Sequence, residues 1–543
     1  MRVGDAVVKT LAAGGIDAVF GIPGKQTLPL NQAMAENGIR YVVARHETAV
    51  SHQAWGYAET TGRPAATVVI PGPGDMNAMN GLKNALNDCT PLVHIAVETE
   101  PEVRGGDGIH ETPPDTYDNV VKANLLVETP QSAVAVVERA LEEATSHPKG
   151  PVRVGIPKNF LPMDVTQATA DEVTETTTDR ENPSLDDAVS LLAEAERPAI
   201  LAGGGIRASG ASTSLKELAA HIDAPVVTTY KGKGTFPEDH NLSAGVLCGG
   251  TSPEVAAVLE SADTLLAVGT DFDAVATGKW KHDFPEKLIH VTYHADDIGT
   301  GYDPAVGIVG DADRTLRALV DALPAKHGDG AERATAARAA DQERFDALVN
   351  DSDVLTSVEA LQSIRDGIPR DAIVTADAGG FRIWTLVSFP AYDARSYVNP
   401  GSWATMGTGL PSAIGAKVAN PERDVVSLNG DGGLMMCIHE LHTLAAEAID
   451  VTVVVFTNHD YAIISEEAAR SYGLSDGAYG WGDAPIDFVA LAESMGLTGR
   501  RAETSTEIQA ELDRARTSEG TTLIEIPTDP YEPQASEWMT KSD

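Results

Sequence analysis

Short apolar runs that end in glycine-rich turns recur along this chain, and a helical stretch follows each of them. The clearest example is residues 424–428, Asp-Val-Val-Ser-Leu, which lead into the turn Asn429–Gly433. Residues 435–448 have the pattern of a helix, and a second apolar run at 451–456 leads to Asn458. Repeated strand–helix–strand units of this kind predict parallel sheets with helices on both faces.

Three regions of the chain repeat this pattern. A chain of 543 residues is too long for one hydrophobic core. We therefore predict an α/β fold with three doubly wound parallel-sheet domains, at residues 1–165, 184–325 and 352–543. A polar, Thr-rich stretch at 166–183 should be a surface connection, and a charged, Ala-rich stretch at 328–344 precedes the third domain. The expected elements of the first domain are strand 40–44, helix 47–59, strand 65–70, helix 75–88 and strand 92–97, and strand 198–202 opens the second.

Acidic residues outnumber basic residues by two to one. The chain has 80 Asp and Glu against 40 Lys and Arg, a formal net charge of -40. This balance excludes non-specific nucleic-acid binding, which needs clustered cations. One interpretation is an ordinary solvated surface. The favoured one is the surface of a halophilic protein, in which high salt screens the self-repulsion, and it predicts loss of structure in low salt.

The sequence has no features of a membrane or disulfide-stabilised protein. No apolar run reaches the length of about 18 residues that a membrane-spanning helix needs. The first five residues lack the layout of a signal peptide, so we expect a cytoplasmic enzyme. The three cysteines, Cys89, Cys248 and Cys437, lie far apart and are expected to be buried apolar residues.

Asp431 and Asn458 follow two apolar strands that a helix connects. Ligands of open α/β sheets bind at the carboxyl ends of the strands, so both side chains should reach one edge. A carboxylate and an amide oxygen are hard ligands that suit Mg²⁺ or Ca²⁺ and not zinc. Glycines in the turn allow backbone N–H groups to approach a phosphate closely. The pattern predicts a metal ion bound to a diphosphate, whereas a tight turn and an unrelated loop asparagine would be the plain structural alternative.

Several segments together resemble one family of enzymes. Gly430-Asp431-Gly432 followed by Asn458 resembles the thiamine diphosphate-binding signature. The other matches occur in the family's order and span almost the whole chain, at residues 45–49, 72–77, 231–240 and 409–417. The chain thus resembles the thiamine diphosphate-dependent enzymes of the acetolactate synthase-like (acetohydroxyacid synthase large subunit-like) family. Its acidic composition resembles that of halophilic proteins, so we expect a haloarchaeal member of this family.

The resemblance implies a domain plan and an assembly. It implies an N-terminal pyrimidine-binding domain, a central Rossmann-like domain and a C-terminal diphosphate-binding domain. It also implies thiamine diphosphate and Mg²⁺ as cofactors and a 2-oxo acid as substrate. The family's active site lies between two subunits. We therefore expect at least a homodimer, and more specifically a homotetramer. The reaction would cleave the C1–C2 bond, and the fragment would pass to an acceptor or leave as an aldehyde.

The resemblance also assigns roles to individual residues. Glu47 would pair with the cofactor's aminopyrimidine ring, since a carboxyl group in an apolar pocket tends to keep its proton. The alternative for Glu47 is a helix-start glutamate favoured by the helix dipole. The residues that would bind the cofactor are Gly72, Asn77, Met406, Gly430, Asp431, Gly432, Gly433 and Asn458. The metal ion would be bound by the side chains of Asp431 and Asn458 and by the backbone carbonyl of Asp460. Met406 would lie under the bend of the cofactor.

Two residues differ from the family where the substrate is expected. His110 stands in Ile109-His110-Glu111, where acetolactate synthases typically have Phe-Gln-Glu, in a loop that reaches the reacting centre. A histidine can donate a proton near neutral pH and would favour simple decarboxylation to an aldehyde, or it could be an exposed loop residue. Lys25 replaces a small residue and would either pair with an anionic group of the substrate or project into solvent.

Other departures concern the cofactors. Residues 379–382, Gly-Gly-Phe-Arg, replace the Gly-Gln-His-Gln run that touches the diphosphate in the family. Asp271 stands where an arginine near FAD is expected, and a carboxylate is unfavourable beside phosphates, so FAD is doubtful.

Three other functions are possible for a chain with parallel sheets and glycine turns. A flavin-dependent oxidase on the same scaffold would need FAD, and a dinucleotide-dependent dehydrogenase would need an acidic residue beyond a GxGxxG turn. The third alternative is a non-catalytic relative that only binds its ligand, and the presence of Glu47 argues against it. The segment His439-Glu440-Leu441-His442 has its histidines at i and i+3, not at the i and i+4 spacing of a zinc protease, so a structural role is expected there.

Overall fold

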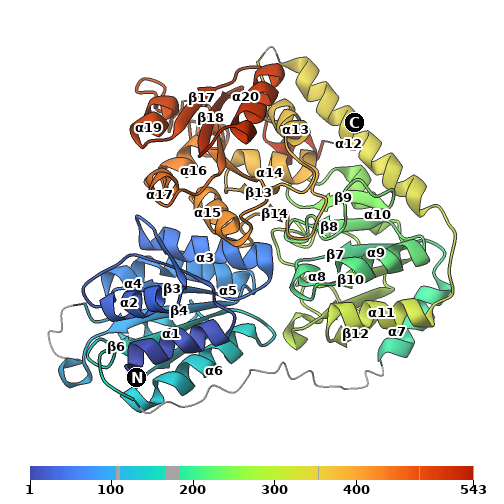
Figure 1. Ribbon diagram of the computed structural model, residues 1–543. Helices are drawn as coiled ribbons and strands as arrows, with labels where there is room; N and C mark the ends of the chain where they lie inside the picture. Colours follow the sequence, from blue (N-terminus) through green and yellow to red (C-terminus); the bar gives the residue numbers. More distant parts are fainter. Residues whose placement is uncertain (106–109, 166–183, 353, 476, 542–543) are drawn as a thin grey trace.

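Three parallel sheets of six strands each form the centre of three domains (Figure 1). The computed structural model describes residues 1–105, 110–165, 184–352, 354–475 and 477–541. Helices cover both faces of each sheet, and all strand pairs within the sheets are parallel. The predicted α/β fold with three doubly wound sheets is therefore confirmed. The expected linker at 166–183 lies outside the described residues.

The N-terminal domain has the strand order β2-β1-β3-β4-β6-β5. Its elements are α1 (Val3–Ala13), β1 (Ala18–Gly21), α2 (Leu28–Glu36), β2 (Arg40–Val43), α3 (Glu47–Thr61), β3 (Ala65–Val69), α4 (Pro73–Asn77), α5 (Met79–Asn87), β4 (Leu92–Glu98), β5 (Ala123–Leu126), α6 (Ala133–Thr145) and β6 (Pro151–Pro157), with short 3-10 turns at Pro101–Val103, Pro114–Tyr117 and Pro130–Ser132.

The central domain has the order β12-β11-β10-β7-β8-β9. Its elements are α7 (Ser184–Glu194), β7 (Pro198–Ala202), α8 (Gly205–Ala208), α9 (Ser212–His221), β8 (Val226–Thr229), β9 (Ser243–Leu247), α10 (Pro253–Glu260), β10 (Thr264–Val268), β11 (Leu288–Thr292), a 3-10 turn (Ala295–Asp297), β12 (Val306–Val309) and α11 (Ala312–Ala322). The charged, Ala-rich stretch forms the long helix α12 (Gly330–Asp351), which runs along the outside of the molecule from the central to the C-terminal domain (Figure 1).

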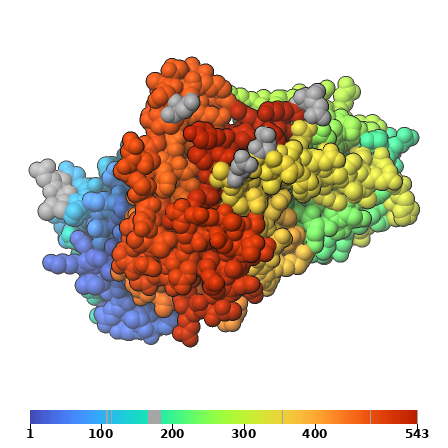
Figure 2. Space-filling model, turned by 90° about the horizontal axis from the view of Figure 1, so that it is seen from above, coloured from blue at the N-terminus to red at the C-terminus, as the bar shows by residue number. Residues whose placement is uncertain are grey.

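The C-terminal domain has the order β14-β13-β15-β16-β18-β17. Its elements are α13 (Ser357–Gly367), β13 (Ile373–Ala376), α14 (Gly380–Ser388), β14 (Tyr397–Val398), α15 (Gly409–Ala419), β15 (Val425–Gly430), α16 (Asp431–Met435), α17 (Glu440–Ala446), β16 (Thr452–Thr457), α18 (Ala462–Tyr472), α19 (Phe488–Ser494), β17 (Thr498–Arg501), α20 (Ser505–Thr517), β18 (Thr522–Pro527) and α21 (Ala535–Trp538). Seen from above, this domain lies between the N-terminal domain and α12 (Figure 2).

Two predicted helices are each divided in the structure. The expected helix 75–88 is α4 and α5, which meet at Ala78. Side chains of α3 bind the carbonyls at this junction, because Thr48 Oγ1 donates to Asn77 O at 2.8 Å and Ser51 Oγ to Ala78 O at 2.9 Å. The Thr48 hydroxyl thus binds a carbonyl that a continuous helix would use itself, whereas Ala78 O also accepts a hydrogen bond from Leu82 N at 3.2 Å.

The prediction of a single helix at 435–448 is also wrong. The chain enters α16 directly from β15 at Asp431 and then makes three-residue turns, in which Cys437 N donates to Leu434 O and Glu440 N to Cys437 O. The second helix, α17, ends at Ala446, and Ala448 has a positive φ of 50° that stops it. The metal turn is thus followed by two short helices.

The N-terminal and C-terminal domains share one apolar core, in which α3 packs directly on α15. The two backbones meet at glycines, since a Cβ at Gly415 would lie 1.8 Å from Gln53 O and one at Gly56 would lie 2.2 Å from Ser412 O. Only residues without a side chain permit this approach. The pair of domains therefore behaves as one packed body.

Buried charges join all three domains at one place. Lys231 of the central domain lies 2.9 Å from Asp88 and 3.6 Å from Glu59, and Arg207 lies 2.8 Å from Glu59. Lys231 Nζ also donates to the backbone carbonyl of Asn399 in the C-terminal domain at 3.1 Å. Burial opposes the charge of Glu59, but Arg207 and Lys231 outweigh it and lower the pKa of that carboxyl.

Among the described residues, no helix has both the length and the apolar character that crossing a membrane requires.

Candidate active site

Glu47 is the first residue of α3, and its carboxylate lies at the carboxyl edge of the N-terminal sheet. The side chain is half-buried, and Asn77 Nδ2 donates to Glu47 Oε2 at 3.0 Å. A Cβ added at Gly74 would come within 3.1 Å of Glu47 Oε1, so the turn after β3 lies directly against the carboxylate. The structure thus brings together Glu47, Asn77 and the 72–77 turn.

His110 lies on the other side of the same turn. A Cβ at Gly72 would be 2.7 Å from His110 Cα, and the φ of +65° at Gly72 favours glycine there. His110 is exposed and has a positive φ of 68°. The loop is tied down two residues later, where Thr112 Oγ1 donates to the buried Asp75 at 2.8 Å. Ile109, the other departure in this loop, lies outside the described residues.

Lys25 follows β1 and is exposed. Its neighbour Gly24 packs on Ile70, since a Cβ at Gly24 would lie 2.2 Å from Ile70 Cγ2, and Ile70 also contacts Gly74. The loop that carries Lys25 therefore borders the turn that contacts Glu47. Across the described ranges, Lys25 has no ion pair.

Asp431 is a buried carboxylate held by backbone amides. Its side chain accepts hydrogen bonds from Gly432 N at 2.7 Å, His459 N at 2.7 Å and Asn458 N at 3.2 Å. Burial raises the pKa of Asp431, although these amides oppose the rise. Among the described residues, no Lys or Arg forms an ion pair with it. A buried carboxylate without a cationic side chain fits a bound cation.

Asn458 and Asp460 lie beside Asp431 at the end of β16. Asn458 Oδ1 accepts a hydrogen bond from Asp460 N at 3.2 Å, and the Asp460 carboxylate accepts one from Ser465 Oγ at 2.6 Å. The Asp460 side chain is thus bound to Ser465 of α18. This leaves its backbone carbonyl as the group for the metal, and that role stays a prediction.

The turn after Asp431 has no room for side chains. A Cβ at Gly432 would lie 2.6 Å from the Tyr461 ring and 3.6 Å from Met406 Cε, and one at Gly433 would lie 2.5 Å from Asp377 Oδ2. The half-buried Met406 therefore lies beside Gly432, close to the predicted metal site. Gly430 ends β15 immediately before Asp431. A turn without side chains lets a diphosphate approach its backbone, although Gly432 N also donates to Asp431 Oδ1.

Asp377 is a residue of the site that sequence reasoning missed. It is fully buried, directly after β13, and accepts hydrogen bonds from Gly407 N and Thr408 N at 3.0 Å each. These bonds fix the backbone that carries Met406, and Asp377 also contacts the Gly433 position. The sequence did contain a signal for Asp377, since it is an acidic residue that directly follows an apolar strand. The same pattern identified Asp431.

The residues that replace the family's Gln and His have other contacts. Phe381 stacks on Phe456 with ring centroids 5.2 Å apart, and its ring lies against Gly430. Arg382 turns away and donates to Asn399 Oδ1 at 3.0 Å and to Pro400 O at 2.6 Å.

The donor set of the central domain does not fit FAD. The cations near the ends of β7 and β8, Arg207 and Lys231, pair with Glu59 and Asp88. Asp271 follows β10 at the same sheet edge. Phosphates would meet a carboxylate there, while Arg207 and Lys231 are already paired.

The segment 439–442 does not form a zinc site. His442 Nδ1 accepts a hydrogen bond from Arg45 Nε at 2.9 Å, and His439 faces His46. In the described part of the chain, no group of three His, Cys, Asp or Glu side chains could hold a metal. The contacts of this segment are thus with Arg45 and His46 of the N-terminal domain.

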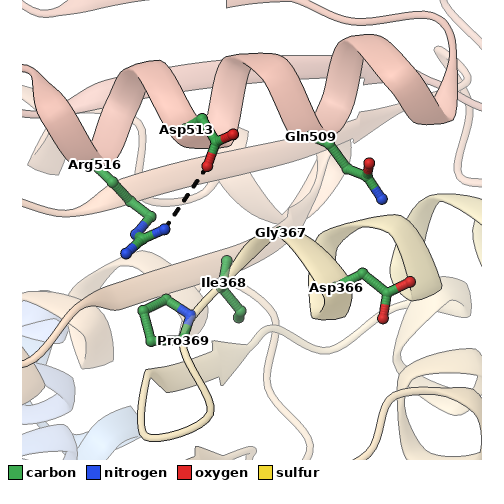
Figure 3. A pocket seen from close by; sticks show the side chains of 7 residues that line it. All are labelled: Asp366, Gly367, Ile368, Pro369, Gln509, Asp513 and Arg516. Carbon is green, nitrogen blue, oxygen red and sulfur yellow. Dashed lines mark ion pairs between the residues drawn. The ribbon is translucent and has the colours of Figure 1, made fainter.

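A surface hollow of about 250 Å³ between α13 and α20 lies elsewhere (Figure 3). It is lined by Asp366, Gly367, Ile368, Pro369, Gln509, Asp513 and Arg516, of which Asp513 and Arg516 form an ion pair at 3.7 Å. None of the predicted site residues lines it, and we assign it no function.

Three family models of known proteins match this chain. Models of thiamine pyrophosphate enzymes match this chain as an N-terminal TPP binding domain at residues 1–119, a central domain at 185–319 and a C-terminal TPP binding domain at 377–526. The "Probable acetolactate synthase large subunit" of Methanocaldococcus jannaschii is 32% identical, over 98% of this chain and 93% of the relative. The acetolactate synthase large subunit of Parasynechococcus marenigrum is 31% identical, over 96% and 86%, and the acetolactate synthase isozyme 1 large subunit of Escherichia coli is 30% identical, over 97% and 94%. The chain therefore belongs to the thiamine pyrophosphate enzyme family, among the relatives of acetolactate synthase large subunits.

Proposed function

We propose that this protein is a thiamine diphosphate- and Mg²⁺-dependent enzyme that cleaves the C1–C2 bond of a 2-oxo acid. The observation that carries the proposal is Asp431, a buried carboxylate with no Lys or Arg partner among the described residues, beside the bare glycine turn 432–433. The names of the relatives favour transfer of the fragment to an acceptor, as in acetolactate synthase.

The residues of the C-terminal domain would hold the cofactor. Mg²⁺ would bind the side chains of Asp431 and Asn458 and the carbonyl of Asp460, and the amides of Gly432 and Gly433 would face the diphosphate. Met406 would support the bend between the two rings. When bound, thiamine diphosphate supplies a nucleophilic carbon and an electron sink for the loss of CO₂.

Glu47 would handle the proton that this chemistry needs. Its carboxyl would hold a proton against a ring nitrogen of the aminopyrimidine. The hydrogen bond from Asn77 to Oε2 orients the carboxyl and leaves Oε1 at the Gly74 side. Asn77 would therefore act by orienting Glu47.

Release of an aldehyde without transfer is the second candidate reaction, and His110 favours it. The imidazole is exposed beside Gly72 at the same sheet edge as Glu47, where a proton donor would quench the bound fragment. Lys25 would meet an anionic group of the substrate from the neighbouring loop. A flavin-dependent oxidase is disfavoured, because the central domain does not suit FAD.

We further propose a homodimer or homotetramer of halophilic, cytoplasmic character. Large apolar side chains beside the metal turn are exposed in the single chain, including Met435 at 41%, Met436 at 52% and Ile464 at 55%. A second subunit over this face would bury them.

Incubation with thiamine diphosphate, Mg²⁺ and a panel of 2-oxo acids in molar KCl tests the reaction. We expect CO₂ release, and analysis of the coupled product separates transfer from aldehyde release. Glu47→Gln should lower turnover at least about 100-fold, because the proton can no longer be shared, while circular dichroism stays unchanged. Glu36→Gln, an exposed residue of α2, is the control. Full activity of Glu47→Gln would refute the role of Glu47, and no CO₂ from any 2-oxo acid would refute the function.

A further inference from the structure

The backbone just before Glu47 is held by the C-terminal domain of the same chain. Arg45 N donates to Glu440 Oε1 at 2.8 Å, and His46 N donates to the same oxygen at 3.1 Å. His46 is extended, and both residues lie outside the β2 ladder and the α3 helix. Buried amides need a partner, and here one carboxylate oxygen serves both.

Glu440 is completely buried, and its second oxygen is also occupied. Glu440 Oε2 accepts hydrogen bonds from Gln53 Nε2 at 3.0 Å and from Thr443 Oγ1 at 2.7 Å. Gln53 lies in α3, so Glu440 binds both the loop before Glu47 and the helix that begins at Glu47. A carboxylate with four donors and no freedom to move is a rigid support.

Other side chains of the same region extend this contact. Arg45 Nε donates to His442 Nδ1 at 2.9 Å, and the rings of His46 and His439 lie 5.7 Å apart. Val43 N donates to Glu447 Oε1 at 3.2 Å, just beyond the end of α17. Figure 1 shows α17 on the side of the C-terminal domain that faces the N-terminal domain.

The position of Glu440 in the chain connects it to the proposed metal turn. It is the first residue of α17 and follows α16, which begins at Asp431. One short segment of ten residues, Asp431 to Glu440, therefore connects the metal turn to the residue that supports the loop before Glu47. The sequence by itself indicated no more than a structural role for this helix.

We infer that Glu440 is a positioning residue for Glu47, which fixes the start of α3 by accepting the amides of Arg45 and His46. The inference rests on the proposed function, in which Glu47 is catalytic. Glu440 acts through the backbone, so what matters is an acceptor at Oε1 and not a negative charge.

Two substitutions separate these properties. Glu440→Ala removes the acceptor. Glu440→Gln keeps it, because the amide oxygen can face Arg45 N and His46 N while the NH₂ group faces Gln53 Oε1 and Thr443 Oγ1. Gln53 Oε1 is buried without a hydrogen-bond partner, and a flipped Gln53 amide would accept this bond.

The test combines steady-state kinetics with amide hydrogen exchange of the cofactor-free protein. Glu440→Ala should lower kcat by about 10- to 100-fold with KM for the 2-oxo acid nearly unchanged, because displaced catalytic groups cost rate. Exchange in a peptide covering residues 43–48 should rise. In Glu440→Gln, kcat and the exchange of this peptide should both stay near the wild-type values. Glu447→Ala, which frees only the more distant Val43 amide, is the matched control with unchanged kcat.

Glu440→Ala with unchanged exchange at 43–48, or with kcat within twofold of wild type, would overturn the inference. So would exchange that rises equally in all peptides, since that means general destabilisation. If Glu440→Ala does not fold, Glu440→Asp withdraws the oxygens by one methylene and carries the same expectations. Failure of the proposed function differs, because the wild-type protein itself would then release no CO₂.

Discussion

Asp431 illustrates how the surroundings of a single side chain constrain the ligand that would bind it. Its described partners are backbone amides, and burial raises its pKa. A carboxylate in such a place is costly unless a cation joins it. A metal ion would supply that compensation and would also hold the cofactor's diphosphate.

Asp431→Ala should lower the affinity for thiamine diphosphate in the presence of Mg²⁺ by at least about 100-fold, because the charged ligand is lost. Isothermal titration measures this, with the exposed Asp450→Ala as control. In the wild type, affinity should fall as the pH drops through the raised pKa of Asp431, since protons then displace the metal, and should be constant above it. Unchanged affinity in Asp431→Ala would count decisively against the site.

Residues that depart from the family were identifiable from the sequence, but their contacts were not. Phe381 and Arg382 were recognisable as replacements, yet only the fold shows Phe381 against Phe456 and Arg382 turned toward Asn399. For Lys25 and His110 the structure gives location and exposure, and their roles remain predictions.

At the scale of elements, helices that meet across domains depend on small residues. The contact of α3 with α15 requires Gly415, whose added Cβ would lie 1.8 Å from Gln53 O. Gln53 also donates to Glu440, so the same helix face serves the core and the support of Glu47.

Gly415→Ala should lower the free energy of unfolding by about 3 kcal/mol or more, because the methyl group forces the two helices apart. The midpoint of urea unfolding in high salt reports the change. Gly482→Ala is the control, because its Cβ would meet nothing within 4 Å. Equal midpoints for Gly415→Ala and the wild-type protein would show that the helices can separate at little cost.

At the scale of the whole molecule, charge acts in two opposite ways. The net charge of -40 means that acidic side chains on the surface repel one another. Where the three domains meet, by contrast, Lys231 and Arg207 neutralise the buried Glu59 and Asp88. Salt screens the first effect strongly and the buried pairs much less.

Dilution from molar KCl to about 10 mM salt should therefore cost secondary structure, because the screening length grows from roughly 3 to 30 Å. Far-ultraviolet circular dichroism follows the loss, and return to molar KCl is the control for reversibility. A spectrum that does not change on dilution would mean that the acidic surface is an ordinary solvated one.

Strand ends, glycine turns and the residues next to them were readable from the chain alone, because strand and turn preferences act over a few residues. This local information sufficed for three parallel-sheet domains and for the positions of Asp431, Asn458 and Glu47. The divided helices at Ala78 and after Met435 were missed, since they depend on the Thr48 hydroxyl of α3 and on the route of the chain out of β15. The partners of Asp377 and Glu440 also come from distant segments, and only the packed fold places those amides within hydrogen-bonding distance.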